Sequence, residues 1–116
     1  MGDNSHSVAD QSAQVAVCRK YALPVIPPED MVAVAIPTIG KMPIHGSRII
    51  LPKDGNISWF IHCGEFSDAD DFYQPLHAAH LQEMLPLVVK YLGLPPGSRF
   101  IIDDQGYEDV WQEQPA

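Results

Sequence analysis

The chain has 116 residues, of which 46% are hydrophobic, and these values indicate one globular domain rather than a disordered segment. The formal net charge of −8, from 15 Asp and Glu against 7 Lys and Arg, disfavours nucleic acid as a partner, because its phosphates would be repelled. The same acidity fits a basic protein partner, a cationic ligand or a metal ion, and equally an acidic protein with a solvated surface.

The sequence carries no sign of export or membrane insertion. The first residues lack a basic segment followed by an apolar one, and no apolar run approaches the roughly 18 residues of a membrane span. The two cysteines, Cys18 and Cys63, lie far apart and form no CxxC pair, so neither a zinc ribbon nor a redox pair is predicted. We therefore expect a cytoplasmic protein without membrane contact.

The first half of the chain predicts a polar tail over residues 1–12 and the start of a single α+β domain over residues 13–114. Val15, Val17, Arg19 and Tyr21 alternate with the residues Ala16, Cys18 and Lys20, which predicts a first strand. Three prolines within residues 23–30 predict an extended connection. The β-branched run Met31–Pro37 predicts a second strand, ended by its proline, which cannot donate a hydrogen bond to a neighbouring strand.

The middle of the chain predicts a hairpin. Residues 38–47 have the composition of a loop, and Arg48–Pro52 predicts a short third strand. The dipeptide Asp54-Gly55 is a strong hairpin signal, so this strand is expected to pair antiparallel with Ile57–Cys63. That run carries bulky residues on both faces, which predicts a central strand with one face packed on a helix.

The second half predicts one helix followed by two strands. After the acidic loop Glu65–Gln74, apolar residues recur at steps of three and four over about residues 75–92, which predicts a helix that Pro86 kinks or breaks. Ser98–Asp103 and Tyr107–Glu113 predict the last strands. The sequence therefore predicts an α+β fold, with a mostly antiparallel sheet packed against one kinked or broken helix.

A metal or acid–base site is one candidate for chemistry. His77 and His80 would lie one turn apart on the predicted helix, and with Glu65 they could hold zinc or iron. No third ligand is fixed by spacing, and the alternative is that His77 bonds to the acidic loop while His80 packs on the sheet. The chain has no phosphate-binding or nucleotide-binding motif, so we expect no cofactor and assign no catalytic residues.

Acidic and aromatic residues gather in two segments, one after the predicted central strand and one near the end of the chain. A solvated acidic face and burial of the rings in the core would explain them, but aromatic rings among acids are also typical of a binding hot spot. The residues expected to contact a partner are Glu65, Asp68, Asp70, Asp71, Phe72, Tyr73, Tyr107, Glu108, Asp109 and Trp111.

A string of motifs also runs through the second half of the chain. Its members are Trp59, Gly64-Glu65, Asp70-Asp71-Phe72, Pro75-Leu76-His77, His80-Leu81, Tyr91–Gly97, Arg99-Phe100 and Tyr107–Trp111. This string resembles the small bacterial domains grouped as immunity protein thirty-three and its relatives, whereas residues 1–54 match no family pattern. The resemblance implies a role in immunity to a polymorphic toxin, which is tied to these domains largely by genomic association, and it assigns no catalytic residues.

These observations together predict a small acidic binding protein rather than an enzyme. It would neutralise a bacterial toxin by covering the toxin's active site, and its acidity would suit a basic toxin. Two alternatives stay open. One is a metal-dependent or acid–base enzyme that uses His77, His80 and Glu65, and the other is a homodimeric adaptor that pairs through an exposed sheet edge.

Overall fold

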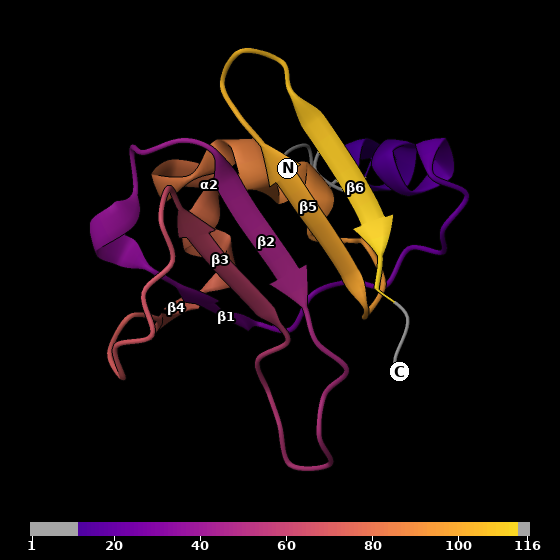
Figure 1. The fold of residues 1–116 in the computed structure, drawn as a ribbon. Coiled ribbons are helices and arrows are strands. Elements are labelled where there is room, and N and C mark those ends of the chain that lie inside the picture. Colours follow the sequence, from indigo (N-terminus) through magenta and orange to yellow (C-terminus); the bar gives the residue numbers. More distant parts are fainter. Residues whose placement is uncertain (1–11, 114–116) are drawn as a thin grey trace, which may run out of the picture.

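Six strands form one sheet in the computed structural model, which describes residues 12–113. The strands lie in the order β4-β1-β3-β2-β5-β6 (Figure 1), and all neighbours are antiparallel except β1 and β3, which are parallel. Their bounds are β1 Met31–Val34, β2 Ile44–Arg48, β3 Trp59–Cys63, β4 Gln74–His77, β5 Ser98–Ile102 and β6 Glu108–Gln112. The predicted mostly antiparallel sheet and the central place of Ile57–Cys63 are thus confirmed.

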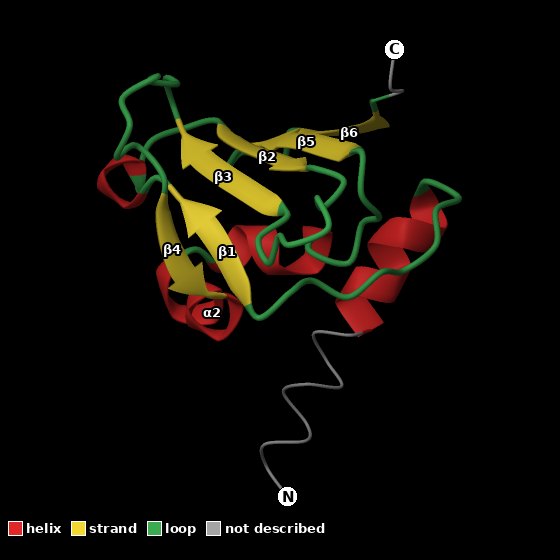
Figure 2. Cartoon of the chain, turned by 90° about the horizontal axis from the view of Figure 1, so that it is seen from below, coloured by secondary structure: helices red, strands yellow, loops and turns green. Residues whose placement is uncertain are grey.

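The helices are short, and most of them lie against one face of the sheet. The N-terminal helix covers residues 12–20, and the 3-10 helix η1 (Ile36–Thr38) follows β1. After β4 come η2 (Ala78–His80), the α-helix α2 (Leu81–Met84) and the 3-10 helix η3 (Pro86–Tyr91). Figure 2 shows the N-terminal helix and α2 beneath the sheet, while the other face of β3, β2, β5 and β6 carries no helix among the described residues. We call this second face the open face.

The prediction of a helix over residues 75–92 is wrong at its start, where the chain forms β4, whereas the predicted break at Pro86 is confirmed. Pro75 lies in β4, which pairs with β1 at the edge of the sheet, where proline is tolerated. The α-helix ends at Met84, and η3 begins at Pro86, because proline lacks the N–H and its ring clashes with the preceding turn. The α+β class holds, but several short helical turns replace the single helix.

The predicted first strand is wrong, because residues 12–20 form a helix. Small and helix-favouring residues allow this conformation, and the helix buries Val17 and Cys18 in the core. Gln14 donates a hydrogen bond to the carbonyl of Val89 at 3.1 Å, and the Cys18 thiol donates one to the carbonyl of Gly93 at 3.4 Å. The predicted tail of residues 1–12 lies, except for its last residue, outside the described residues.

The third strand also lies earlier than predicted. It occupies Ile44–Arg48, inside the segment expected to be a loop, and pairs antiparallel with β3 across a connection that turns at Gly55. Its apolar alternation is hidden because Gly46 and Arg48 take core positions. A Cβ atom at Gly46 would lie 2.1 Å from the ring of Phe100, so the close packing of that ring requires glycine.

The core lies between the sheet and the helices. Trp59 and Phe100 are both fully buried, with ring centroids 5.6 Å apart, and Phe100 stacks on Tyr91 at 4.8 Å. The indole N–H of Trp59 donates to the carbonyl of Leu92 at 3.0 Å, which ties β3 to the end of η3. No helix among residues 12–113 combines the length and apolar character that crossing a membrane requires.

Arg48 joins separate segments inside this core. Its side chain is 1% exposed and donates hydrogen bonds to the carbonyls of two chain segments as well as to Ser58, at 3.0 Å, and Glu29, at 3.4 Å. The carbonyls that accept from it are those of Ile26 (2.6 Å), Pro27 (2.8 Å), Leu92 (3.4 Å) and Leu94 (2.6 Å). A charged residue thus holds the Pro-rich connection before β1 against the sheet.

Candidate functional site

Two rows of side chains cross the open face at right angles to the strands. Side chains alternate between the faces of a sheet, so residues next to core positions point outward here. From β3 to β6 the first row is Phe60, Ser47, Arg99 and Trp111. The second row is His62, His45, Ile101 and Asp109.

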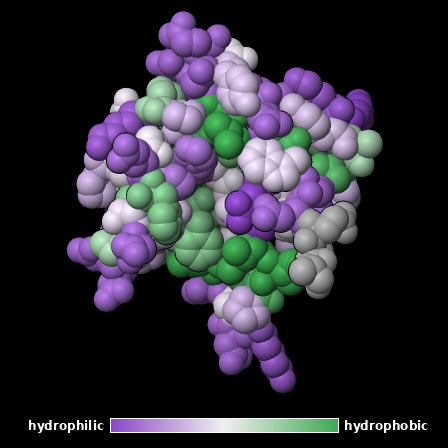
Figure 3. Space-filling model, in the orientation of Figure 1, coloured by the Kyte–Doolittle hydropathy of each residue, from purple (hydrophilic) through white to green (hydrophobic). Residues whose placement is uncertain are grey.

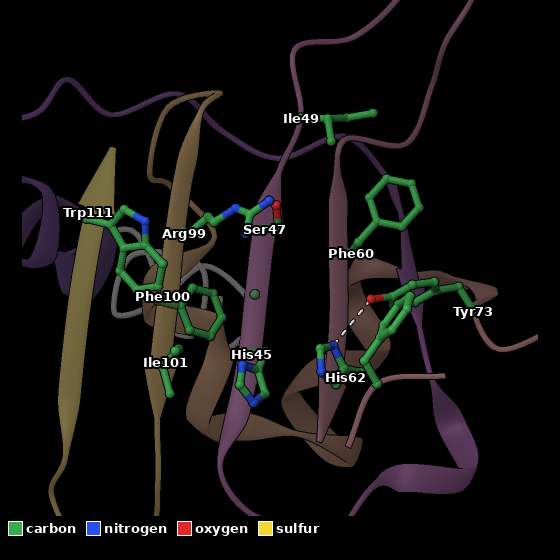
Figure 4. Close-up of a pocket in the computed structure, with 12 residues that line it drawn as sticks. His45, Ser47, Ile49, Phe60, His62, Tyr73, Arg99, Phe100, Ile101 and Trp111 are labelled. Carbon is green, nitrogen blue, oxygen red and sulfur yellow. Dashed lines mark hydrogen bonds between the residues drawn. The ribbon is translucent and has the colours of Figure 1, made fainter. Parts of the chain in front are cut away.

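A groove of about 570 Å³ lies over these rows. Phe66 and Tyr73, from the loop after β3, line one side of it, and Trp111 of β6 lines the other. Figure 4 shows Tyr73 and Trp111 on opposite sides of the groove, with His45 between them and Arg99 reaching toward Ser47. In Figure 3 apolar side chains gather over the centre and lower part of this face, with hydrophilic ones around them. The volume and the lining are typical of a binding site.

Aromatic rings form the wall of the groove next to β3. The ring of His62 lies 5.7 Å from Phe66, 5.8 Å from Phe72 and 6.4 Å from Tyr73. Tyr73 also packs edge-on against Phe60 at 5.3 Å, and its hydroxyl lies 3.3 Å from Nδ1 of His62. These contacts hold the loop in place, while residue Phe66 remains 62% exposed. The wall therefore presents a positioned apolar ring to solvent.

Two imidazoles form part of the groove floor. The rings of His45 and His62 stack with centroids 4.5 Å apart and planes 4° from parallel. Burial lowers the pKa of both histidines, and the neighbouring His45 lowers the pKa of His62 further. Burial also raises the pKa of the Tyr73 hydroxyl, against a smaller opposite effect of Arg99. At neutral pH the floor therefore offers uncharged hydrogen-bonding groups.

The acidic residues of the open face lie at its margins, whereas the cationic Arg99 lies within the groove lining. Glu65, Asp68, Asp70 and Asp71 are exposed on the loop after β3. Asp109 is exposed at the far end of the second row. On the first row Arg99 pairs with Glu113 at 2.7 Å, and both side chains are about half exposed. An exposed ion pair of this kind contributes little to the stability of the fold. The acidic residues of the loop and Asp109 of β6 lie on the two sides of the groove.

The structure brings together the two segments predicted to contact a partner, because the acidic loop and β6 border the same groove. Phe72 is half-buried behind the wall, and Tyr107 lies in the turn before β6, outside the groove lining. The sequence prediction missed the residues between the segments, because β2 was expected to be a loop. Alternation along β3 and β5 could have indicated part of this set, which comprises His45, Ser47, Phe60, His62, Phe66, Arg99 and Ile101.

Glu108 lies on the other face of the sheet, away from the groove. Its carboxylate accepts hydrogen bonds from Lys20 at 2.6 Å and from the hydroxyls of Tyr21 and Tyr91 at 2.5 Å each. Burial would raise the pKa of Glu108, but these three hydrogen bonds outweigh burial and lower the pKa to about 2. Glu108 therefore fastens the end of the N-terminal helix to β6, and we no longer assign it to partner contact.

Replacing Glu108 by Gln is expected to lower the free energy of unfolding at pH 7 by about 1–3 kcal/mol, because an amide cannot accept all three bonds. The folded-state pKa of Glu108 is depressed, so its carboxylate stabilises the fold above its usual value of 4.5, and this stabilisation is lost as pH falls toward about 2. Urea unfolding of the wild-type protein and of Glu108→Gln, from pH 7 down to about 2, measures this difference in stability. A difference in stability that stays constant with pH would contradict the assignment.

The metal alternative lacks a third ligand. His77 ends β4 and His80 ends η2, and their exposed rings lie 5.7 Å apart. Within residues 12–113 no three His, Cys, Asp or Glu side chains are arranged to hold a metal ion, so Glu65 does not complete a site with them.

Comparison with protein-family models matches residues 13–113 to the Imm33-like domain. The match agrees with the resemblance found in the sequence and extends it, because it also includes the first half of the domain. No curated protein and no solved structure gives a significant match.

Proposed function

The chain belongs to the Imm33-like domain family, and from this premise we propose that it is an immunity-type protein that binds a bacterial toxin through its open face. The observation that carries the proposal is the groove between Phe66 and Trp111. Both of the segments singled out by their acidic and aromatic residues border this groove, although they are far apart in the chain. Rings presented around a groove are the usual anchors of protein interfaces.

The charges at the margin favour a basic toxin. The net charge of −8 and the exposed acids at Asp68, Asp70 and Asp71 create a negative field that would steer a basic surface toward the groove. Within the groove the paired imidazoles of His45 and His62 are uncharged, so they can be covered at a small desolvation cost. Neutralisation then follows from occlusion, since a toxin bound across four strands has part of its own surface covered. We place this encounter in the cytoplasm.

Reversing the charge of Asp68, Asp70 and Asp71 to Lys is expected to weaken toxin binding about tenfold, mainly by slowing association, because steering by the loop is lost. The measurement is association kinetics with the product of the neighbouring gene as the candidate toxin, at low and at high salt, together with rescue of cells that express this candidate. The effect should shrink at high salt, since exposed charges are screened.

The matched control is Glu83→Lys, which reverses an exposed acid on α2, on the helix side of the sheet. It should leave association nearly unchanged. The control changes the net charge by two and the triple variant by six, so slowing by the control of about one third of the triple variant's effect on a logarithmic scale would show that net charge alone matters. Unchanged binding and rescue with the triple variant would refute this face as the toxin site.

A further inference from the structure

The two outer edges of the sheet differ in how they can meet another strand. On β4 the hydrogen bond from Ala78 to the carbonyl of Asp30 continues the ladder with β1, so the backbone groups of Pro75 and His77 point outward. Pro75 has no N–H to donate. Proline at an outward position is a common means of closing an edge against another strand, and β4 is closed in this way.

The ladder between β5 and β6 fixes which groups of β6 point outward. Asp103 donates to the carbonyl of Tyr107 at 3.2 Å, and Glu113 donates to the carbonyl of Gly97 at 2.7 Å. These pairs extend the register in which Arg99 faces Trp111, so the odd-numbered residues of β6 bond to β5. The even-numbered residues therefore direct their N–H and C=O groups away from the sheet.

The outward-facing residues of β6 are Glu108, Val110 and Gln112. Within residues 12–113 no strand lies outside β6, and no hydrogen bond is found to the backbone groups of these residues. None of them is a proline, in contrast to β4. The edge of β6 is thus a row of unpaired donors and acceptors that suits a further strand.

We propose that this strand is β6 of a second copy of the chain, paired antiparallel about a two-fold axis at Val110. In this register Val110 faces its counterpart, and Glu108 faces the partner subunit's Gln112. Each outward-facing residue then donates and accepts one backbone hydrogen bond, so every open group on the edge is used. This assembly is independent of the toxin-binding proposal.

The side chains select this register over its neighbours. With the axis at Val110, Asp109 lies opposite the partner subunit's Trp111 in a closely spaced pair, and no like charges meet. Moving the axis to Asp109 would place two Asp109 carboxylates opposite each other. Moving it to Trp111 would place Asp109 opposite the partner subunit's Glu113. Like charges directly opposite destabilise a pair of strands, so the register centred on Val110 is favoured over these two neighbours.

The assembly would double the partner-binding face. A two-fold axis through an antiparallel strand pair is perpendicular to the sheet, so both open faces point to the same side. The two grooves would then be joined at the centre by Trp111 and Asp109 of both copies. A toxin with two binding surfaces, or two toxin molecules, could be held by one continuous sheet.

The test compares Trp111→Glu with Trp111→Lys by analytical ultracentrifugation across a concentration series. The wild-type protein is expected at twice the 12.8 kDa mass of the chain. Glu at position 111 faces the partner subunit's Asp109, whereas Lys there forms an opposite-charge pair, so the dimer dissociation constant should be about tenfold higher for Glu. Within one chain Arg99 lies opposite position 111 and favours Glu there. If the substitutions acted on folding instead of on dimerisation, Trp111→Glu would therefore be the more stable of the two variants.

The double variant Asp109→Lys with Trp111→Glu restores opposite charges across the axis and should recover the dimer. Circular dichroism checks that each variant is folded. A wild-type protein that is monomeric at all concentrations would overturn the proposal. That result is also the one expected if a toxin strand, rather than a second copy, pairs with the edge of β6. Equal dissociation constants for the two single variants, or no recovery in the double variant, would overturn the register. None of these measurements involves the toxin, so failure here leaves the toxin proposal separately testable.

Discussion

Replacing Arg48 by Met is expected to lower the free energy of unfolding by about 3–5 kcal/mol, as is usual when one partner of a buried charged network is removed. Met fills a similar length but donates no hydrogen bond. The carbonyls of Ile26 and Leu94, each 2.6 Å from the guanidinium, would be buried without that donor, and Glu29 would lose its cation. Urea unfolding followed by circular dichroism measures the difference, which is a large part of the roughly 5–15 kcal/mol of a typical domain.

Arg99→Met provides the matched control, because it removes the same group from an exposed position where it pairs with Glu113. Its effect on stability should stay below about 1 kcal/mol. A similar loss for both variants would mean that the charge of the chain, rather than the buried network of Arg48, sets the stability.

Replacing Phe66 by Ala is expected to weaken toxin binding about 30-fold, the effect of losing a hot-spot ring that contributes about 2 kcal/mol. The residue is 62% exposed but its ring packs at 5.4 Å against Phe72, so the ring is already positioned for a partner. Little stability should be lost, because the removed atoms are mostly in solvent. Calorimetric titration of the toxin against wild-type and variant protein gives the ratio of dissociation constants.

Leu87→Ala serves as its control, since Leu87 is a 41% exposed apolar residue on η3, on the helix side of the sheet. Toxin affinity should be the same for this variant and the wild-type protein. If Phe66→Ala binds as tightly as the control, the groove is not the toxin site, whatever the role of the acidic loop.

Local patterns predicted the strands whose core positions are filled by apolar side chains. The alternation of residues in β3 and β5 predicted where these strands lie. Pro86, which lacks an N–H, predicted the break in the helical segment. β2 was misplaced because glycine and arginine occupy its core positions, and Gly46 is explained only by the ring of Phe100 from a distant strand. The parallel pairing of β1 with β3 has no local signal, since it depends on contacts across the sheet.

The candidate site was predictable at its borders and not at its centre. The acidic loop and the last strand stood out by composition, whereas His45 lay in a segment expected to be a loop. The sequence predicts Glu108 at the partner face because it belongs to the acidic and aromatic cluster near the end of the chain, yet strand alternation turns it toward Lys20 and Tyr91. Successive side chains of a strand point to opposite faces, so Glu108 and Asp109 cannot share the partner face, although their composition groups them together.

The bond between Lys20 and Glu108 also sets the order in which the protein can be completed during synthesis. These residues are 88 positions apart, and the Cys18 thiol meets a carbonyl 75 positions later. The N-terminal helix therefore leaves the ribosome long before its docking surface exists, and it must wait with Val17 uncovered until β6 has been made. Contacts of such long range slow folding, so we expect the docking of the N-terminal helix onto β6 to come late in folding.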